Sequence, residues 1–248
     1  MKNFINFSLG EYKKLIYQAK TKVILALTVL YAVAMGVVSF IIKNNTGVTV
    51  VSPERFPAFI LEILTGLILP LFTILIVSEL YAAEFKDATI KNLFALPVSK
   101  SIIYLGKIVA GAALIGTVIL TLGISGLVMN VAINGSDAFS GIGMSFISYS
   151  GTFIFLTAVL FITAFFTLLT ASPNIAVVMN LMIWFVMGLA GTFLAPVRQY
   201  LPTGFTQWYQ PLVNGTNATT ALPTLIYMLS YCVIFAVAGL IIFERKEV

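Results

Sequence analysis

The chain has 248 residues, of which 60% are hydrophobic and only 9% are charged. A soluble globular domain carries about 25% charged residues, so this composition excludes a soluble protein and predicts an integral membrane protein. No stretch outside the apolar runs is long enough to bury a core, and we expect residues 1–248 to form a single membrane domain. The chain has no histidine, a single cysteine and no G-x-x-x-x-G-K-[ST] sequence. We therefore expect it to bind neither a metal nor a nucleotide cofactor itself.

Six apolar runs are long enough to cross the hydrocarbon core of a bilayer, which takes about 20 residues of helix. The runs are continuous rather than alternating, so they predict helices and not the strands of a barrel. The expected fold class is an all-α integral membrane protein with six transmembrane helices. The predicted spans are residues 23–42, 57–78, 108–133, 146–170, 176–195 and 223–243.

The distribution of lysine and arginine predicts the orientation, because these residues accumulate on the cytoplasmic side. The N-terminal segment, the connector between the second and third runs, and the C-terminal tail hold five, four and two of them. The alternate loops hold only Lys43, Arg55 and Arg198. We therefore expect both termini in the cytoplasm. The net charge of +5 reflects topology and contact with lipid headgroups, and we expect no binding to nucleic acid.

Residues 1–22 precede the first span and predict an amphipathic helix at the membrane interface. Leu9, Tyr12 and Ile16 recur at helical spacing, whereas Glu11 and several lysines point elsewhere. Such a helix lies along the headgroups with its lysines on the polar side. An anchor that only fixes topology and a mechanical role are equally compatible with this pattern.

The second span contains the acidic residue Glu62, and an ionisable residue inside a span is a functional candidate. On a regular helix Glu62, Gly66 and Thr73 share a face, with Thr65 at its edge, and this stripe would line a transport pathway. The alternative is that Glu62 reaches the outer interface or pairs with Arg55 or Arg198. Pro70 removes a helix hydrogen bond in mid-span and predicts a kink.

The fifth span places Asn180 and Trp184 one turn apart. These two residues are candidates for the pathway lining. The same residues also suit ordinary interhelical packing, which is the interpretation that we favour. Residues 196–222 then form the longest outer segment. Its aromatic residues predict a re-entrant piece that dips into the outer membrane interface rather than a solvated loop.

The connector is the most polar stretch between two spans, and residues 84–95 predict a short cytoplasmic helix. Glu84, Asp87 and Lys91 form a charged stripe at helical spacing, with the last two in the favourable order for a surface pair. Ile90, Leu93 and Phe94 form an adjacent apolar face. Pro97 ends the helix, and Ser99 caps the next one, which leads into the third span. This geometry suits a helix that docks in a groove of a partner protein; the alternative is an inert interfacial helix.

The connector resembles the loop between the second and third spans of ABC-2 type permeases, the membrane subunits of type V (ABCG-like) ABC exporters. The family pattern is an acidic residue, Gly-Thr-hydrophobic-basic, a leucine-rich stretch, Pro-hydrophobic-Ser/Thr-basic and Gly/Ser-Lys. Ala88 stands at the usual glycine position. The matching residues are Glu84, Thr89, Ile90, Lys91, Pro97, Val98, Ser99, Lys100, Gly106 and Lys107.

The resemblance implies that residues 84–95 are the coupling helix, which contacts a separate cytoplasmic ABC ATPase subunit that binds ATP and magnesium. The residues expected to contribute are Glu84, Asp87, Thr89, Ile90, Lys91, Leu93, Phe94 and Pro97. It also implies a second permease subunit, a location in a bacterial plasma membrane, and no catalysis by this chain. The chain length is similar to that of small Gram-positive permeases that export antimicrobial or cytolytic peptides.

The expected function is therefore ATP-driven export of amphipathic or apolar molecules, with peptides as the first choice. Export of a lipid, glycan or drug remains an alternative within the same class. An ion-gradient-driven secondary transporter is a rival of another class, although the chain shows no convincing internal repeat. A membrane scaffold or immunity protein that does not transport is a third interpretation.

Overall fold

The computed structural model describes residues 2–49, 51–86, 90, 98–170, 172–215 and 218–246. Within these ranges the chain is helical and contains no strand, which confirms the predicted all-α fold class. Six of the described segments are helices long and apolar enough to cross a membrane. They are Ala19–Thr46, Ile68–Lys86, Lys100–Phe139, Ile142–Leu168, Pro173–Phe193 and Ala221–Arg245.

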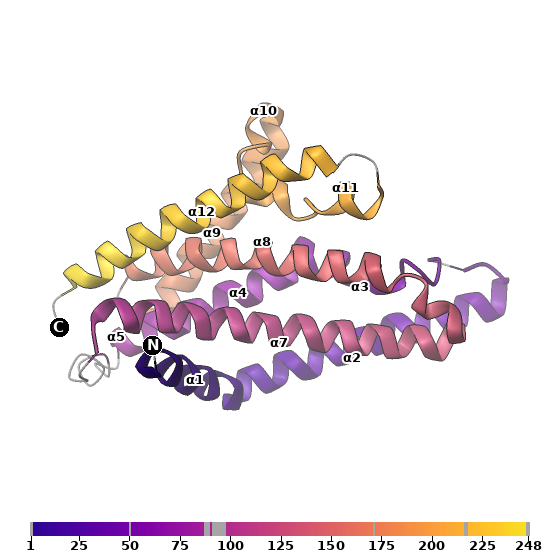
Figure 1. Ribbon diagram of the computed structural model, residues 1–248, viewed down its shortest axis with the longest axis horizontal. Helices are drawn as coiled ribbons and strands as arrows, with labels where there is room; N and C mark the ends of the chain where they lie inside the picture. The colour runs from indigo at the N-terminus through magenta and orange to yellow at the C-terminus, as the bar shows by residue number, and fades with distance from the viewer. Residues whose placement is uncertain are drawn as a thin grey trace.

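The helices form an elongated bundle in which both chain termini lie toward the same end (Figure 1). We call this the connector end, because the chain leaves the helix that ends at Lys86 there and enters the one that begins at Lys100. The opposite end, formed by residues 47–49, 51–55 and 135–141, is called the far end. These two names are independent of which end faces the cytoplasm.

The N-terminal region consists of two helices joined by a sharp bend. Helix α1 (Lys2–Tyr17) ends before Gln18, whose backbone is extended, and α2 (Ala19–Thr46) follows. The predicted interfacial segment 1–22 is therefore divided between α1 and the first turn of α2. Gly47 ends α2 in the left-handed conformation, with its N–H bonded to the carbonyl of Lys43, a conformation that glycine adopts without strain.

The second predicted span is broken in the middle. Helix α3 (Phe56–Gly66) ends at Leu67, where φ is −141°, and α4 (Ile68–Ser78) begins immediately afterwards. Pro70 has no N–H for the carbonyl of Gly66 and its ring crowds that carbonyl, so the break falls just before the proline. The predicted kink is confirmed. The chain continues through a π-helical turn, η1 (Glu79–Ala83), into α5 (Glu84–Lys86).

Two long helices form the centre of the bundle. Ser99 caps α7 (Lys100–Asn134) by accepting a hydrogen bond from the N–H of Ile102, as predicted. The short helix η2 (Gly135–Phe139) leads into α8 (Ile142–Leu168), which packs against α4, α7 and α12. Helix α7 extends well before the predicted apolar run 108–133, because its first two turns lie among the polar groups of the connector end.

The C-terminal part returns from α9 (Pro173–Phe193) through α10 (Ala195–Arg198), η3 (Pro202–Phe205) and α11 (Gln210–Val213) to α12 (Ala218–Arg245). Between η3 and α11, Trp208 donates from its indole Nε1 to the carbonyl of Gly151 at 2.9 Å. The ring of Tyr209 is fully buried beside the same glycine. Trp208 and Tyr209 thus pack against α8, whereas Tyr200 and Phe205 pack with Tyr227 of α12. The predicted contact of this segment with the membrane interface stays a prediction.

Helices α2, α9 and α12 bury only a small share of their apolar surface within the chain. Their large aliphatic and aromatic side chains point outward, among them Leu30, Val178, Phe185, Leu229 and Ile234. A membrane-spanning helix keeps such side chains against lipid or a second subunit. The outer helices therefore present the apolar surface of a multi-pass membrane protein.

Candidate functional site

A buried cluster of charged side chains occupies the connector end, and Lys107 is at its centre. The Lys107 side chain has no exposed surface, and its Nζ lies 2.8 Å from carboxylate oxygens of both Glu11 and Glu84. It also donates to the carbonyl of Leu80 at 3.3 Å, in the π-helical turn. The ammonium group thus joins three elements that are distant in the sequence: α1, the start of the connector and α7.

A second lysine completes the charge balance of this cluster. Lys14, one turn after Glu11 on α1, donates to Glu84 Oε1 at 2.6 Å. Burial lowers the pKa of Lys14, but the hydrogen bond that Lys14 donates to Glu84 and the charges of Glu84 and Glu11 outweigh this, so the pKa lies above its ordinary value. Two ammonium groups and two carboxylates therefore compensate each other. Such mutual pairing is what makes buried charges tolerable. We call Glu11, Lys14, Glu84 and Lys107 the connector charge cluster.

Helix α1 meets the bundle with a different face from the predicted one. Its buried residues are Ser8, Glu11 and Leu15, which pack against α7, whereas Leu9 and Ile5 are half exposed. Glu11 was expected on the polar side of an interfacial helix, and the structure buries it because Lys107 offers a partner. Of the predicted apolar side, Tyr12 packs against the core, with its hydroxyl 2.9 Å from Thr117 Oγ1 of α7, whereas Leu9 stays exposed.

Aromatic residues surround the connector charge cluster. Tyr81 donates to the carbonyl of Tyr104 at 2.9 Å, and both rings pack with Phe243 of α12. Lys246, beyond the end of α12, lies with its Nζ 4.0 Å from the ring centroid of Phe85, a cation–π geometry. The C-terminal end of α12 is therefore attached to the same region as the connector.

Two of the predicted coupling residues lie within the described part of the chain. The spacing predicted that Glu84 lies in a charged surface stripe, but Glu84 is 6% exposed and its carboxylate belongs to the connector charge cluster. Ile90 is helical and 1% exposed. The remaining predicted residues, Asp87, Thr89, Lys91, Leu93, Phe94 and Pro97, lie outside the described residues.

The predicted pathway stripe of the second span is interrupted by the break at Leu67. Thr65 and Thr73 are buried, and each hydroxyl donates to a carbonyl one turn earlier in its own helix. Gly66 is exposed and has open space around it. A continuous polar stripe requires a regular helix, and the break turns α4 relative to α3. Among the predicted members, only Glu62 opens into a cavity that the structure describes.

The two candidates in α9 contact α8. Asn180 is buried and donates from Nδ2 to Thr167 Oγ1 at 3.1 Å and to the carbonyl of Ala176 at 2.8 Å. The Trp184 ring packs against Phe155, with the centroids 6.1 Å apart. Within one subunit both residues hold α9 against α8, and a role in lining a pathway stays a prediction.

We expect Asn180→Leu to destabilise the protein by about 0.6 kcal/mol, the typical worth of one interhelical hydrogen bond in a membrane. Transport should be unchanged if Asn180 only joins α8 and α9. Thermal unfolding in detergent and a transport assay measure the two effects, with the exposed Asn174→Leu on the same helix as control. Normal stability with a strong loss of transport would instead assign Asn180 to the pathway.

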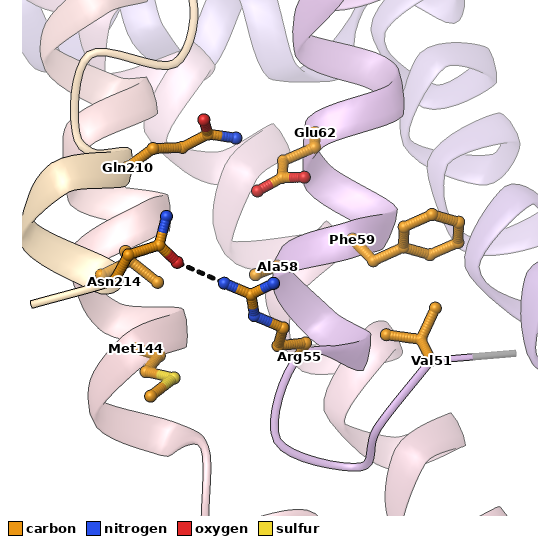
Figure 2. Close-up of a pocket in the computed structure, with 9 residues that line it drawn as sticks. Val51, Arg55, Ala58, Phe59, Glu62, Met144, Gln210 and Asn214 are labelled. Carbon is orange, nitrogen blue, oxygen red and sulfur yellow. Dashed lines mark hydrogen bonds between the residues drawn. The ribbon is translucent and has the colours of Figure 1, made fainter. Parts of the chain in front are cut away.

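A polar cavity of about 450 Å³ opens at the far end between α3, α8 and α11. Figure 2 shows Arg55, Glu62, Gln210 and Asn214 directed into the same space. Arg55 donates to the amide oxygen of Asn214. Among the described residues Glu62 forms no ion pair, so the predicted alternative of pairing with Arg55 or Arg198 is not observed. The cavity is lined by Val51, Arg55, Ala58, Phe59, Glu62, Met144, Gln210, Val213 and Asn214.

Neither end of the bundle offers a metal site, since no group of three potential ligands comes together in the described parts of the chain. The helices define a multi-pass α-helical membrane protein with a polar connector anchored by buried charges. The chain belongs to the ABC-2 family of transporter proteins, whose family model matches residues 18–188. No curated protein matches the chain in sequence.

Family membership makes this chain a permease, the membrane subunit of an ABC transporter, which works with an ABC ATPase that is a separate subunit. The matched region begins at Gln18, at the bend before α2, and ends within α9. It includes Glu84 and Lys107 of the connector charge cluster. It does not include α1 or α11, so Glu11 and the Gln210–Asn214 wall of the far-end cavity lie outside the matched region.

Proposed function

We propose that this permease exports amphipathic or apolar molecules, with amphipathic peptides as the preferred class, and that residues 84–95 are its coupling helix. The connector end would then face the cytoplasm of a bacterium, as the lysine and arginine distribution predicts. The observation that carries the proposal is the buried ion pairing of Glu84 with Lys107, at the point where the connector leaves the membrane-spanning part.

The connector charge cluster supplies a mechanical link. A push from an ATPase on residues 84–95 acts on Glu84, whose carboxylate is fixed to Lys107 of α7 and to Lys14 of α1. Helix α7 is continuous from the connector end to Asn134, and α4 precedes Glu84 through the π-helical turn. Movement of the connector therefore shifts α1, α4 and α7 together rather than bending an isolated loop.

A second permease copy or a related subunit would complete the pathway. The apolar faces of α2, α9 and α12 remain uncovered within one chain, and α3 exposes Gly66 on its surface. Two subunits that meet through such faces would enclose a space lined by the second and fifth predicted spans. The apolar character of these faces favours amphipathic peptides, lipids or drugs over strongly hydrated sugars as substrates.

The test is co-purification of the chain with its ATPase and measurement of ATP-coupled export. Asp87→Lys and Lys91→Glu reverse charges on the proposed coupling helix, and each should weaken assembly at least tenfold, since like charges across an interface cost several kcal/mol. Lys13→Glu is the matched control, because Lys13 is exposed on α1. The assignment fails if both connector variants assemble and export normally. Export driven by an ion gradient without the ATPase would place the protein in another transporter class.

A further inference from the structure

The far-end cavity contains two opposite charges that do not pair with each other. Arg55 precedes α3 by one residue and Glu62 lies seven residues further on, about 10 Å along the helix axis at 1.5 Å per residue. Their side chains extend toward a common space (Figure 2), yet they do not reach ion-pair distance. An open space between a fixed cation and a fixed anion suits a ligand with two charged groups. Its own cation would lie beside the protein's anion, and its own anion beside the protein's cation.

Glu62 forms the anionic wall. It is half buried and, among the described residues, has no cationic partner, which is costly for a carboxylate away from bulk water. The amide of Gln210 projects from the opposite side of the cavity (Figure 2). Burial raises the pKa of Tyr209 to about 12, an interaction with Thr152 opposes this and the Glu62 charge adds to it. Tyr209 therefore stays neutral and adds no second negative charge near Glu62.

Arg55 forms the cationic wall, near the mouth. Asn214 holds its guanidinium by accepting one hydrogen bond, and a guanidinium has five N–H donors. This contact orients the remaining donors, and among the described residues none of them is hydrogen-bonded to another side chain, so they can bind an oxyanion. Arginine binds phosphate through two parallel hydrogen bonds, a geometry that lysine does not provide.

We propose that the far-end cavity binds a zwitterionic ammonium–phosphate group, with the ammonium at Glu62 and the phosphate at Arg55. Phosphoethanolamine has this chemistry, since a two-carbon linker separates its primary ammonium from its phosphate. The ammonium donates to the Glu62 carboxylate, and Met144 and Val213 provide apolar wall for the carbon atoms. The inference is independent of the direction of transport and of the proposed peptide substrates.

The charges also define what the site rejects. A simple cation meets Arg55 and a simple anion meets Glu62, so each is repelled by one wall. A quaternary ammonium such as choline has no N–H to donate to Glu62, and it should bind more weakly than a primary ammonium. The cavity volume of about 450 Å³ lies within the range of small-molecule sites, roughly 300–1,000 Å³.

The experiment uses the full chain, purified with its ATPase, in nanodiscs of phosphatidylglycerol. Dioleoylphosphatidylethanolamine is titrated in, and the lipid retained by the protein is measured by native mass spectrometry, with the phosphatidylcholine analogue and soluble O-phosphoethanolamine in parallel. We expect Glu62→Gln and Arg55→Gln each to reduce ethanolamine-lipid binding by about ten- to hundredfold, the worth of a hydrogen bond to a charged group. Glu54→Gln, an exposed neighbour outside the cavity lining, should bind as the unaltered protein does.

The two probes distinguish the source of the group. If both the lipid and O-phosphoethanolamine bind, and both are sensitive to Glu62→Gln, the site recognises the headgroup without the acyl chains. If the lipid alone binds, the site also requires the acyl chains. Equal binding of ethanolamine and choline lipids would overturn the proposal, as would unchanged binding in both cavity variants. Glu62-dependent binding of a cationic amphipathic peptide without lipid binding would overturn it in favour of a peptide site.

Discussion

Replacement of Lys107 by Met is expected to destabilise the permease by about 3–5 kcal/mol, the cost of removing one partner from a buried ion pair. Methionine fills a similar volume, so the loss comes from the charges and not from a cavity. Without the Lys107 ammonium, Glu11 and Glu84 are left as two buried carboxylates, and one cation of the connector charge cluster, Lys14, remains to compensate two negative charges. Thermal unfolding in detergent should show a midpoint lower by roughly 10 °C, and coupling between ATP hydrolysis and transport should fall with it.

Two comparisons separate the charge effect from a general loss of a lysine. Lys13→Met removes an exposed lysine from α1 and should change the unfolding free energy by less than about 0.5 kcal/mol. Replacing both carboxylates in the Lys107→Met background, with Glu11→Leu and Glu84→Leu, should restore much of the stability, because apolar residues of similar volume often match buried ion pairs. If Lys107→Met were no more harmful than Lys13→Met, the connector charge cluster would not support the fold.

The helices of this protein were predictable because lipid imposes them. A backbone in hydrocarbon must satisfy its own hydrogen bonds, so each apolar run of sufficient length becomes a helix regardless of what it packs against. The cap at Ser99 and the break before Pro70 were predictable for a different reason, since both follow from chemistry within one turn of the chain. The π-helical turn at Glu79–Ala83 was not predicted, because no residue type marks such a turn.

The connector charge cluster was not predictable, because its members are far apart in the chain. Lys107 and its partner Glu11 are separated by 96 residues, and a lysine near the end of a span is by default counted as a topology signal. Likewise Arg55 and Asn214 are 159 residues apart, so their contact depends on how the 196–222 segment folds back. Glu62 was identified by its charge alone, and its neighbours came only from the tertiary structure.

Replacement of Gly141 by Ala is expected to destabilise the protein by about 1–3 kcal/mol, the usual cost of overpacking, and to distort the far-end cavity. Gly141 precedes α8, and a Cβ atom there would overlap the backbone carbonyl of Glu54. Backbone cannot rotate away as a side chain can, so the loop at residues 51–55 has to move. Arg55 follows Glu54 directly, and its displacement should break the hydrogen bond to Asn214 and weaken binding of phosphatidylethanolamine in the nanodisc assay.

Gly143→Ala is the matched control, since it lies two residues further on in the first turn of α8 and has open space where the Cβ would be. Alanine is a better helix residue than glycine, so this change should stabilise by up to about 0.5–1 kcal/mol. Opposite signs for the two substitutions in thermal unfolding would show that the close approach of α8 to Glu54, and not a general need for glycine, holds the far end together. Equal, small effects would mean that residues 51–55 are free to move away from α8, and Arg55 would then have no fixed position from which to bind an anion.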